Sequence, residues 1–187
     1  SSGILIYNLS AWDISTATYS STFALGSYMQ NFTGITFNPD GTKMYVVASN
    51  NAAYGSNPAV HYFTLTTAFT PSTATWISDT YLANQAPEPK GIAFNPSGTI
   101  MNIVDDYFNK IFYYTLSTPF VPSAATSGSI SISNEDTQPA GIAFNNDGTK
   151  LYTTGAIGND INEYNVGSFV STSGYQPVHT LKISLIT

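Results

Sequence analysis

One pattern is written three times in this chain, and this repeat limits the possible folds more than any other feature of the sequence. Each copy reads Gly-Ile-x-Phe-Asn, continues through a short polar stretch and ends on Gly-Thr and a strand-like run; the copies occupy residues 34–45, 91–102 and 141–152. The first two copies start 57 residues apart, at 34 and 91, and the third starts 50 residues later, at 141. A period of this length indicates a tandem array of similar supersecondary units.

Each copy has the residue pattern of a β-hairpin. The alternation in Gly-Ile-x-Phe favours a strand whose glycine permits close backbone approach where strands crowd together, as they do around a propeller axis. In the first copy, Pro39 presets φ at the second turn position and Gly41 accepts the left-handed conformation that closes the turn. Asp40 is explained as a turn residue that hydrogen-bonds backbone amides. We therefore expect an inner strand, a tight turn and a second strand in every copy.

A second landmark has the same phase as the first. Strand-like segments align an aromatic residue at one position, and each is followed by a Ser/Thr-rich connection with a further aromatic and then by an outer strand such as residues 74–82. The segments are residues 4–9, 60–65, 111–116 and 161–166, their aligned aromatics are Tyr7, Phe63, Tyr114 and Tyr164, and the connection aromatics are Trp12, Phe69, Phe120 and Phe169. Inner, second, third and outer strands make up one propeller blade.

The sequence therefore predicts an all-β fold, a β-propeller of four-stranded antiparallel blades with three complete blades plus an outer half-blade. We expect one domain over residues 1–187, divided into a half-blade at 1–33 and blades at 34–90, 91–140 and 141–187. Closed propellers use about 4 to 8 blades, and open ends leave strand edges that proteins pair or cover. The chain is expected to be a partial propeller or part of a larger ring, completed by further sequence or by an oligomer.

Composition excludes several classes of protein. Aromatic residues make up 14% of the chain and charged residues only 9%, which is the opposite of a disordered chain. Five Lys and Arg against eleven Asp and Glu give a net charge of −6, so no nucleic-acid partner is expected. The sequence has no cysteine and no apolar run long enough to span a membrane. The two histidines, His61 and His179, are interpreted as ordinary strand residues.

The repeats resemble a known group of propellers. Asn38-Pro39-Asp40-Gly41, followed by Met-Tyr-Val at residues 44–46, resembles the repeats of lactonase-like and WD-repeat-like propellers, whose blades carry a Ser-Pro-Asp-Gly-like turn before a Leu-Tyr-Val-like strand. The longer connections at residues 9–18, 65–75 and 116–126 are similar to repeats of phage and marine bacterial structural or surface proteins. The resemblance implies the propeller fold, but propellers host hydrolases, lectins, scaffolds and receptors alike.

The first complete blade differs from the others by an insertion. From Gly34 to Phe63 is 29 residues, whereas from Gly91 to Tyr114 and from Gly141 to Tyr164 is 23, so six extra residues lie within residues 49–58. Such insertions often form the binding surface of a repeat array, although a neutral surface insertion is an equal alternative. The connection aromatics are either sugar-stacking platforms or hydrophobic plugs, and their recurrence favours plugs. The candidate ligand-binding residues are Asn50, Asn51, Tyr54, Asn57 and Trp12.

One acidic pair is a weak candidate for a metal or catalytic site. Asp105 and Asp106 could supply oxygen ligands or a pair of carboxyls with separated pKa values. The equivalent positions elsewhere are Ala48-Ser49 and Gly155-Ala156, so a solvated strand end is the favoured interpretation. No nucleophile elbow, phosphate-binding glycine loop or metal-binding helix motif is present. No catalytic residue and no cofactor is predicted.

These observations favour a non-catalytic structural or binding module. We expect it on a virion, as part of a phage tail, fibre or capsid decoration, or on a cell surface, and therefore outside the cell. Its expected partners are other protein subunits, either copies of itself or the remainder of the propeller, or a receptor. A secreted carbohydrate-binding propeller that recognises a surface glycan is the first alternative. A lactonase-like hydrolase is the second alternative; no catalytic residue can be assigned to it, and a loss of activity on changing Asp105 or Asp106 would support it.

Overall fold

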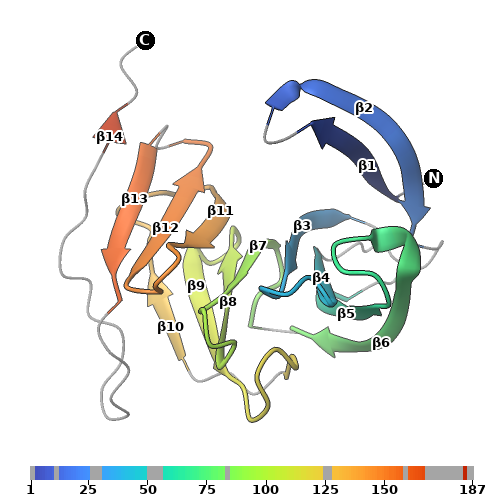
Figure 1. Cartoon of the computed structure of the whole chain (residues 1–187). Coiled ribbons are helices and arrows are strands. Elements are labelled where there is room, and N and C mark those ends of the chain that lie inside the picture. The colour runs from blue at the N-terminus through green and yellow to red at the C-terminus, as the bar shows by residue number, and fades with distance from the viewer. Residues whose placement is uncertain are drawn as a thin grey trace.

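The computed structural model of the chain is all β (Figure 1). It describes residues 3–10, 13–25, 31–49, 57–82, 85–123, 128–157, 160–166 and 183–184. Those residues form fourteen strands and one short 3₁₀ turn, arranged as one two-stranded hairpin followed by three four-stranded antiparallel sheets. None of them belongs to a helix that is long and apolar enough to cross a membrane.

The strands of each sheet lie in their sequence order. The hairpin consists of β1 (Gly3–Ser10) and β2 (Asp13–Ala24). The first sheet consists of β3 (Phe32–Phe37), β4 (Lys43–Ala48), β5 (Ala59–Leu65) and β6 (Ala74–Tyr81), with η1 (Pro71–Thr73) before β6. The second consists of β7 (Pro89–Phe94), β8 (Ile100–Asp105), β9 (Lys110–Thr115) and β10 (Gly128–Ser131), and the third of β11 (Pro139–Phe144), β12 (Lys150–Gly155), β13 (Asp160–Asn165) and β14 (Ile183–Ser184). This is the predicted order of inner, second, third and outer strand.

The inner strands of neighbouring sheets approach closely at the glycines that lead the first two repeats. In Figure 1, β3, β7 and β11 gather toward the centre, while β6, β10 and β14 lie at the periphery. A Cβ atom on Gly34 would lie 3.0 Å from the carbonyl oxygen of Lys90, and one on Gly91 would lie 3.2 Å from Cγ2 of Ile142. Only a residue without a side chain fits this approach comfortably, so the predicted role of the glycine is confirmed.

The turn between the inner and second strands has the expected chemistry. Gly41, Gly98 and Gly148 have φ values of 70°, 69° and 73°, in the left-handed region. The side chain of Asp40 accepts a hydrogen bond from the amide of Thr42 at 2.9 Å. Bonds from the hydroxyl and amide of Thr42 hold the pKa of Asp40 below its usual value, because they stabilise the ionised carboxylate.

The connection aromatics Phe69 and Phe120 clamp these turns. Each has a left-handed φ, 56° and 59° respectively, and each donates its amide to the carbonyl oxygen of a turn glycine, Gly41 or Gly98, at 2.9 Å. Each ring covers its glycine so closely that a Cβ atom there would overlap the ring. Phe120 packs against the core cluster of the first and second sheets, as a hydrophobic plug would, whereas Phe69 is 57% exposed although it covers Gly41. Trp12 and Phe169 lie outside the described residues.

The apolar core is divided among the junctions between sheets. β4 is buried on both faces, since Met44 and Val46 pack toward the hairpin while Tyr45 and Val47 pack toward the second sheet. The hydroxyl of Tyr45 also crosses that junction and donates to the carbonyl oxygen of Phe120 at 2.7 Å. A third cluster joins the second and third sheets; its buried members are Val104, Ile111, Ile132, Leu151, Tyr164 and Val166. Each sheet therefore depends on its neighbour for burial.

The clamp predicts a specific energetic coupling. Gly41→Ala should destabilise the protein by about 2 to 4 kcal/mol, because left-handed backbone costs an L-residue about 1 to 2 kcal/mol and the methyl group overlaps the ring of Phe69. In a Phe69→Ala background the same change should cost only the backbone strain. Urea denaturation of the four proteins of this cycle measures the coupling, and an equal cost of Gly41→Ala in both backgrounds would contradict the clamp.

Candidate binding face

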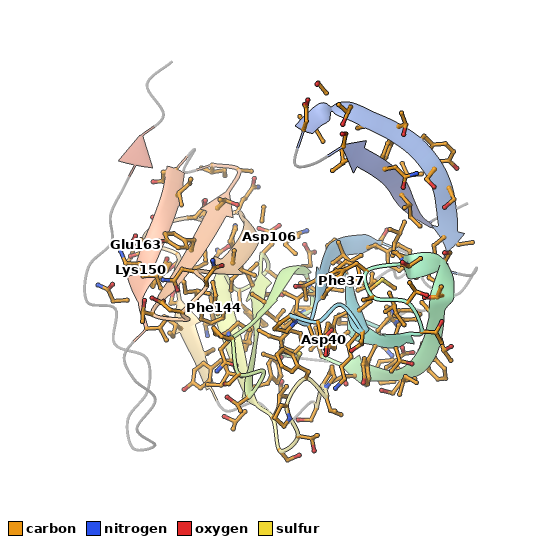
Figure 2. All side chains as sticks on the ribbon, viewed as in Figure 1. Phe37, Asp40, Asp106, Phe144, Lys150 and Glu163 are labelled. Atoms are coloured by element: carbon orange, nitrogen blue, oxygen red, sulfur yellow. The ribbon has the colours of Figure 1, made fainter. Side chains whose placement is uncertain are left out.

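The two ends of the inner strands carry different structures. The hairpin turns with their glycines lie at one end, and the connections between second and third strands lie at the other. The second strands run back toward the starts of the inner strands. Their last residues therefore lie opposite the first residues of β3, β7 and β11; these last residues are Ala48 of β4, Asp105 of β8 and Gly155 of β12. Figure 2 shows Asp106, which follows β8, at the end of the sheets away from Asp40 in a hairpin turn. We call the end with Asp106 the connection face.

Asp105 fixes the connection between β8 and β9. Its side chain is fully buried, and its carboxylate accepts hydrogen bonds at 2.8 Å from the amide of Phe108 and at 2.8 Å from the amide of Glu88. Burial raises the pKa of Asp105, while the two amide bonds act in the opposite direction. The interpretation of Asp105 as a solvated strand end is therefore wrong, because its carboxylate caps two backbone groups inside the protein.

Asn109 ties the same connection to the chain that precedes the third sheet. Its backbone has a φ of 53°, and its carbonyl oxygen accepts from the amide of Ile132 at 2.9 Å. With its amide group oriented to donate, the side-chain nitrogen lies 2.9 Å from the carbonyl oxygens of both Thr137 and Asp106. The connection is therefore held by bonds on both sides and is a fixed turn.

This fixed turn displays two aromatic rings to solvent. Tyr107 is 65% exposed and Phe108 is 41% exposed. Their ring centroids lie 4.9 Å apart with the planes nearly perpendicular, and the Nζ atom of Lys110 lies 5.8 Å from the centroid of Phe108. Adjacent exposed aromatics on a rigid support are unusual for a surface that has only to be soluble. We call Tyr107 and Phe108 the aromatic turn.

Charged groups lie beside the aromatic turn. The Nζ atom of Lys90 is 3.4 Å from a carboxylate oxygen of Asp106 and 3.5 Å from one of Glu88. All three side chains are partly exposed, so these ion pairs add little to stability. They place polar groups of both signs near an apolar feature, a combination that is common at protein-binding surfaces.

The third sheet places an equivalent carboxylate from a different position in the chain. Glu88 and Gln138 are equivalent, since their carbonyl oxygens accept from the residues that follow β8 and β12 at 3.1 and 2.9 Å. The amide of Gln138 donates to the side chain of Asp136 at 2.7 Å, and the other oxygen of Asp136 fills the space that a Cβ atom of Gly155 would occupy. In the second sheet, Asp105 stands in place of Gly155 and Ala86 in place of Asp136. One carboxylate thus caps the amide before each of these two inner strands.

The structure describes only part of the predicted ligand site. Asn50, Asn51, Tyr54 and Trp12 lie outside the described residues. Asn57 is exposed near the end of the insertion, two residues before β5 begins on the connection face. At the start of the insertion the hydroxyl of Ser49 donates to the carbonyl oxygen of Pro89 at 3.1 Å, so the insertion begins beside the second sheet.

Sequence reasoning missed the aromatic turn, although a signal was present. Tyr107 and Phe108 are consecutive aromatics between two strands, in a connection of four residues where turn formers are common. Asp105 and Asp106 are adjacent in sequence, but the side chain of Asp105 binds amides and that of Asp106 lies near Lys90. Among the residues that the structure describes, no three His, Cys, Asp or Glu side chains form a group that could hold a metal ion.

An open, mostly apolar hollow of about 490 Å³ lies at the opposite end of the inner strands. It is lined by the ends of β3, β7 and β11 and by the turns that follow them, with Phe37, Phe94 and Phe144 as its largest side chains together with Phe120. Phe37 and Phe144 are labelled in Figure 2. The residues that line it include no ionisable side chain, so it offers no described acid or base.

Comparison with known proteins identifies the fold but no family. No family model matches the chain, and no curated protein matches its sequence. A putative 6-phosphogluconolactonase from Bacteroides uniformis superimposes with a TM-score of 0.58 at 14% identity, over 94% of this chain and 51% of that one. A functionally unknown protein from Desulfotomaculum acetoxidans gives 0.56 at 15% identity, over 88% and 46%. A nidogen/laminin complex gives 0.51 at 15% identity, over 74% and 44%.

At these identities the similarity is one of fold alone. The match to a lactonase-like propeller agrees with the all-β, propeller-like arrangement of sheets described above. This chain spans about half of the length of each of these three structures, or less.

The capping role of Asp105 predicts a large cost for its removal. Asp105→Ala should destabilise the protein by about 2 to 4 kcal/mol, because two backbone amides lose their buried, charged acceptor. Asp106→Ala, at the partly exposed neighbour, is the matched control and should change the free energy of unfolding by about 0.5 kcal/mol or less.

Because burial raises the pKa of Asp105, folding favours the protonated form of its side chain. Wild type should therefore gain stability relative to Asp105→Asn as pH falls from 7 toward 4.

The alternative placement of the carboxylate predicts a rescue. Gly155 does not have a left-handed φ, so a side chain there causes no backbone strain. Gly155→Asp alone should destabilise the protein by about 3 kcal/mol or more, because two carboxylates would compete for one buried space. Adding Asp136→Ala should restore most of the lost stability by reproducing the arrangement of the second sheet. Thermal and urea unfolding compare the single and double variants, and a double variant as unstable as Gly155→Asp would contradict the equivalence.

Proposed function

We propose that this chain is a non-catalytic binding module of a virion or cell surface, and that it contacts a protein partner through the connection face. The aromatic turn carries this proposal. Tyr107 and Phe108 offer exposed apolar area on a turn that Asp105 and Asn109 already hold in place. Binding through such a turn loses little conformational entropy, because hydrogen bonds already hold the turn in one geometry before a partner binds.

The composition of the face supports a protein partner. Tyrosine is among the residues that contribute most to binding energy at interfaces, where a polar rim surrounds an apolar centre. Here the mixed charges of Lys90, Glu88 and Asp106 supply such a rim. The insertion begins at Ser49, which lies beside the second sheet, and its sequence is rich in Asn.

The use of the acidic groups supports a role other than catalysis. The buried carboxylates of Asp105 and Asp136 bind backbone amides, and the apolar hollow is lined without an ionisable side chain. Low charge, the absence of cysteine and connections similar to those of phage structural proteins support a location on a virion or cell surface. If the connection face bound a surface glycan instead of a protein, the class of partner would change but the binding site would be the same.

A photo-crosslinking experiment tests the aromatic turn. A benzoylphenylalanine in place of Tyr107 should crosslink to a protein in virion or envelope fractions of the source organism. The same group in place of Ser97, an exposed residue in a hairpin turn at the other end of the sheets, should not. For the protein identified, Tyr107→Ala should weaken binding about 30-fold, the effect of removing a central aromatic worth about 2 kcal/mol.

Two outcomes would contradict the proposal. Equal crosslinking from positions 107 and 97 would mean that the connection face has no special part in recognition. Binding to a glycan array that is lost in Tyr107→Ala, without any protein crosslink, would replace the protein partner by a carbohydrate.

A further inference from the structure

We propose that the free edge of β1 is an acceptor site for a two-stranded β-hairpin with the repeat pattern Gly-Ile-x-Phe-Asn-x-Asp-Gly-Thr, supplied by a polypeptide segment outside the strands described here. This surface is separate from the connection face, and its test is independent of the function proposed above.

The position of β1 in the repeat indicates which strands would pair with its free edge. β1 aligns with β5, β9 and β13, and like β5, β9 and β13 it pairs with the strand that follows it. The other edge of β5, β9 and β13 pairs with a second strand, β4, β8 or β12. Among the described strands, β1 pairs with β2 alone. In Figure 1, β1 lies on the side of the hairpin toward the centre of the arrangement, where an inner and a second strand belong.

The side chains of β1 are those of a buried third strand. Leu5, Tyr7 and Leu9 are 58%, 51% and 49% exposed. The equivalent residues in the complete sheets are all at most 8% exposed; they are His61, Phe112 and Asn162 for Leu5, Phe63, Tyr114 and Tyr164 for Tyr7, and Leu65, Leu116 and Val166 for Leu9. The same repeat positions are therefore buried wherever the blade is complete and exposed only where it is not.

The edge also lacks the residues that protect exposed strands. β1 reads Gly-Ile-Leu-Ile-Tyr-Asn-Leu-Ser and contains no charged residue and no proline, with which natural proteins commonly prevent unwanted pairing. Unpaired amide and carbonyl groups along such an edge are a template for strand addition, in which main-chain hydrogen bonds supply the affinity.

A second copy of the chain is a poorer occupant. Each inner and second strand that the structure describes already pairs within its own sheet, so a second copy could donate a hairpin only by opening a blade. The exposed side of the third sheet is also more polar than its counterparts. Thr154 and Glu163 stand there where the first sheet has Val47 and Tyr62. A separate segment of the same repeat pattern meets neither obstacle.

Trans-addition of a hairpin peptide tests the site. The probe is a fluorescently labelled peptide with the sequence of residues 139–155, which form an inner strand, turn and second strand in this protein, added to the full chain. Saturable binding is expected, with amide hydrogen exchange of residues 3–10 slowed at least about tenfold. The same peptide N-methylated at alternate residues of its second strand should not bind, because it cannot form the ladder.

A matched pair of variants locates the binding. Tyr7→Lys should weaken peptide binding at least about tenfold, whereas Tyr81→Lys, at a similarly exposed aromatic on the outer strand β6, should leave it unchanged. If neither the 139–155 peptide nor a peptide with the sequence of residues 89–105 binds, the proposal is overturned. Protection of residues 3–10 by concentration-dependent dimerisation without peptide would overturn it in favour of a second copy. Neither result would affect crosslinking through Tyr107.

Discussion

Burial of the second strand on both of its faces is the interaction on which the fold depends. β4 and β8 are almost wholly buried, and their alternate residues serve different junctions. Met101 and Ile103 belong to the cluster shared with the first sheet, while Val104 belongs to the cluster shared with the third. No sheet has a core of its own, so the stability of each sheet comes from pairwise packing with its neighbours, as in other repeat proteins.

Close packing of the sheets creates a need for local hydrogen-bond acceptors. The inner strands crowd together at Gly34 and Gly91. The amides just before β7 and β11, those of Glu88 and Gln138, need an acceptor, since an amide without a partner is costly. The carboxylates of Asp105 and Asp136 meet this need in the second and third sheets. The carboxylate must lie near the amide that precedes the inner strand, but it can come from either of two sequence positions, that of Asp105 or that of Asp136. The presence of Asp105 is therefore explained by this local need, even though the residue looks like a departure from the repeat.

The parts of the fold that the sequence predicted are those that local chemistry determines. Strand order, the left-handed Gly41 and the role of Asp40 follow from residues within one hairpin, so a repeat of three such hairpins was sufficient. The burial of Asp105 was not predictable in the same way, because one of its partners, the amide of Glu88, lies 17 residues away. The fixed aromatic turn depends equally on distant groups, since Asn109 reaches the chain before the third sheet. Of the predicted ligand residues, only Asn57 is described, so the insertion stays a prediction.

The two proposed surfaces use different physical sources of affinity and lie on different sheets. The acceptor edge belongs to the hairpin and the aromatic turn to the second sheet, and the whole first sheet lies between them in sequence and in the series of shared clusters. Main-chain pairing along β1 depends on backbone geometry and the repeat pattern, so it can complete a sheet with little demand on individual side chains. Recognition at Tyr107 and Phe108 depends on side chains that a few substitutions can alter. No described residue takes part in both surfaces, and a completed sheet beside β1 would shield apolar side chains of the hairpin without using any residue of the aromatic turn.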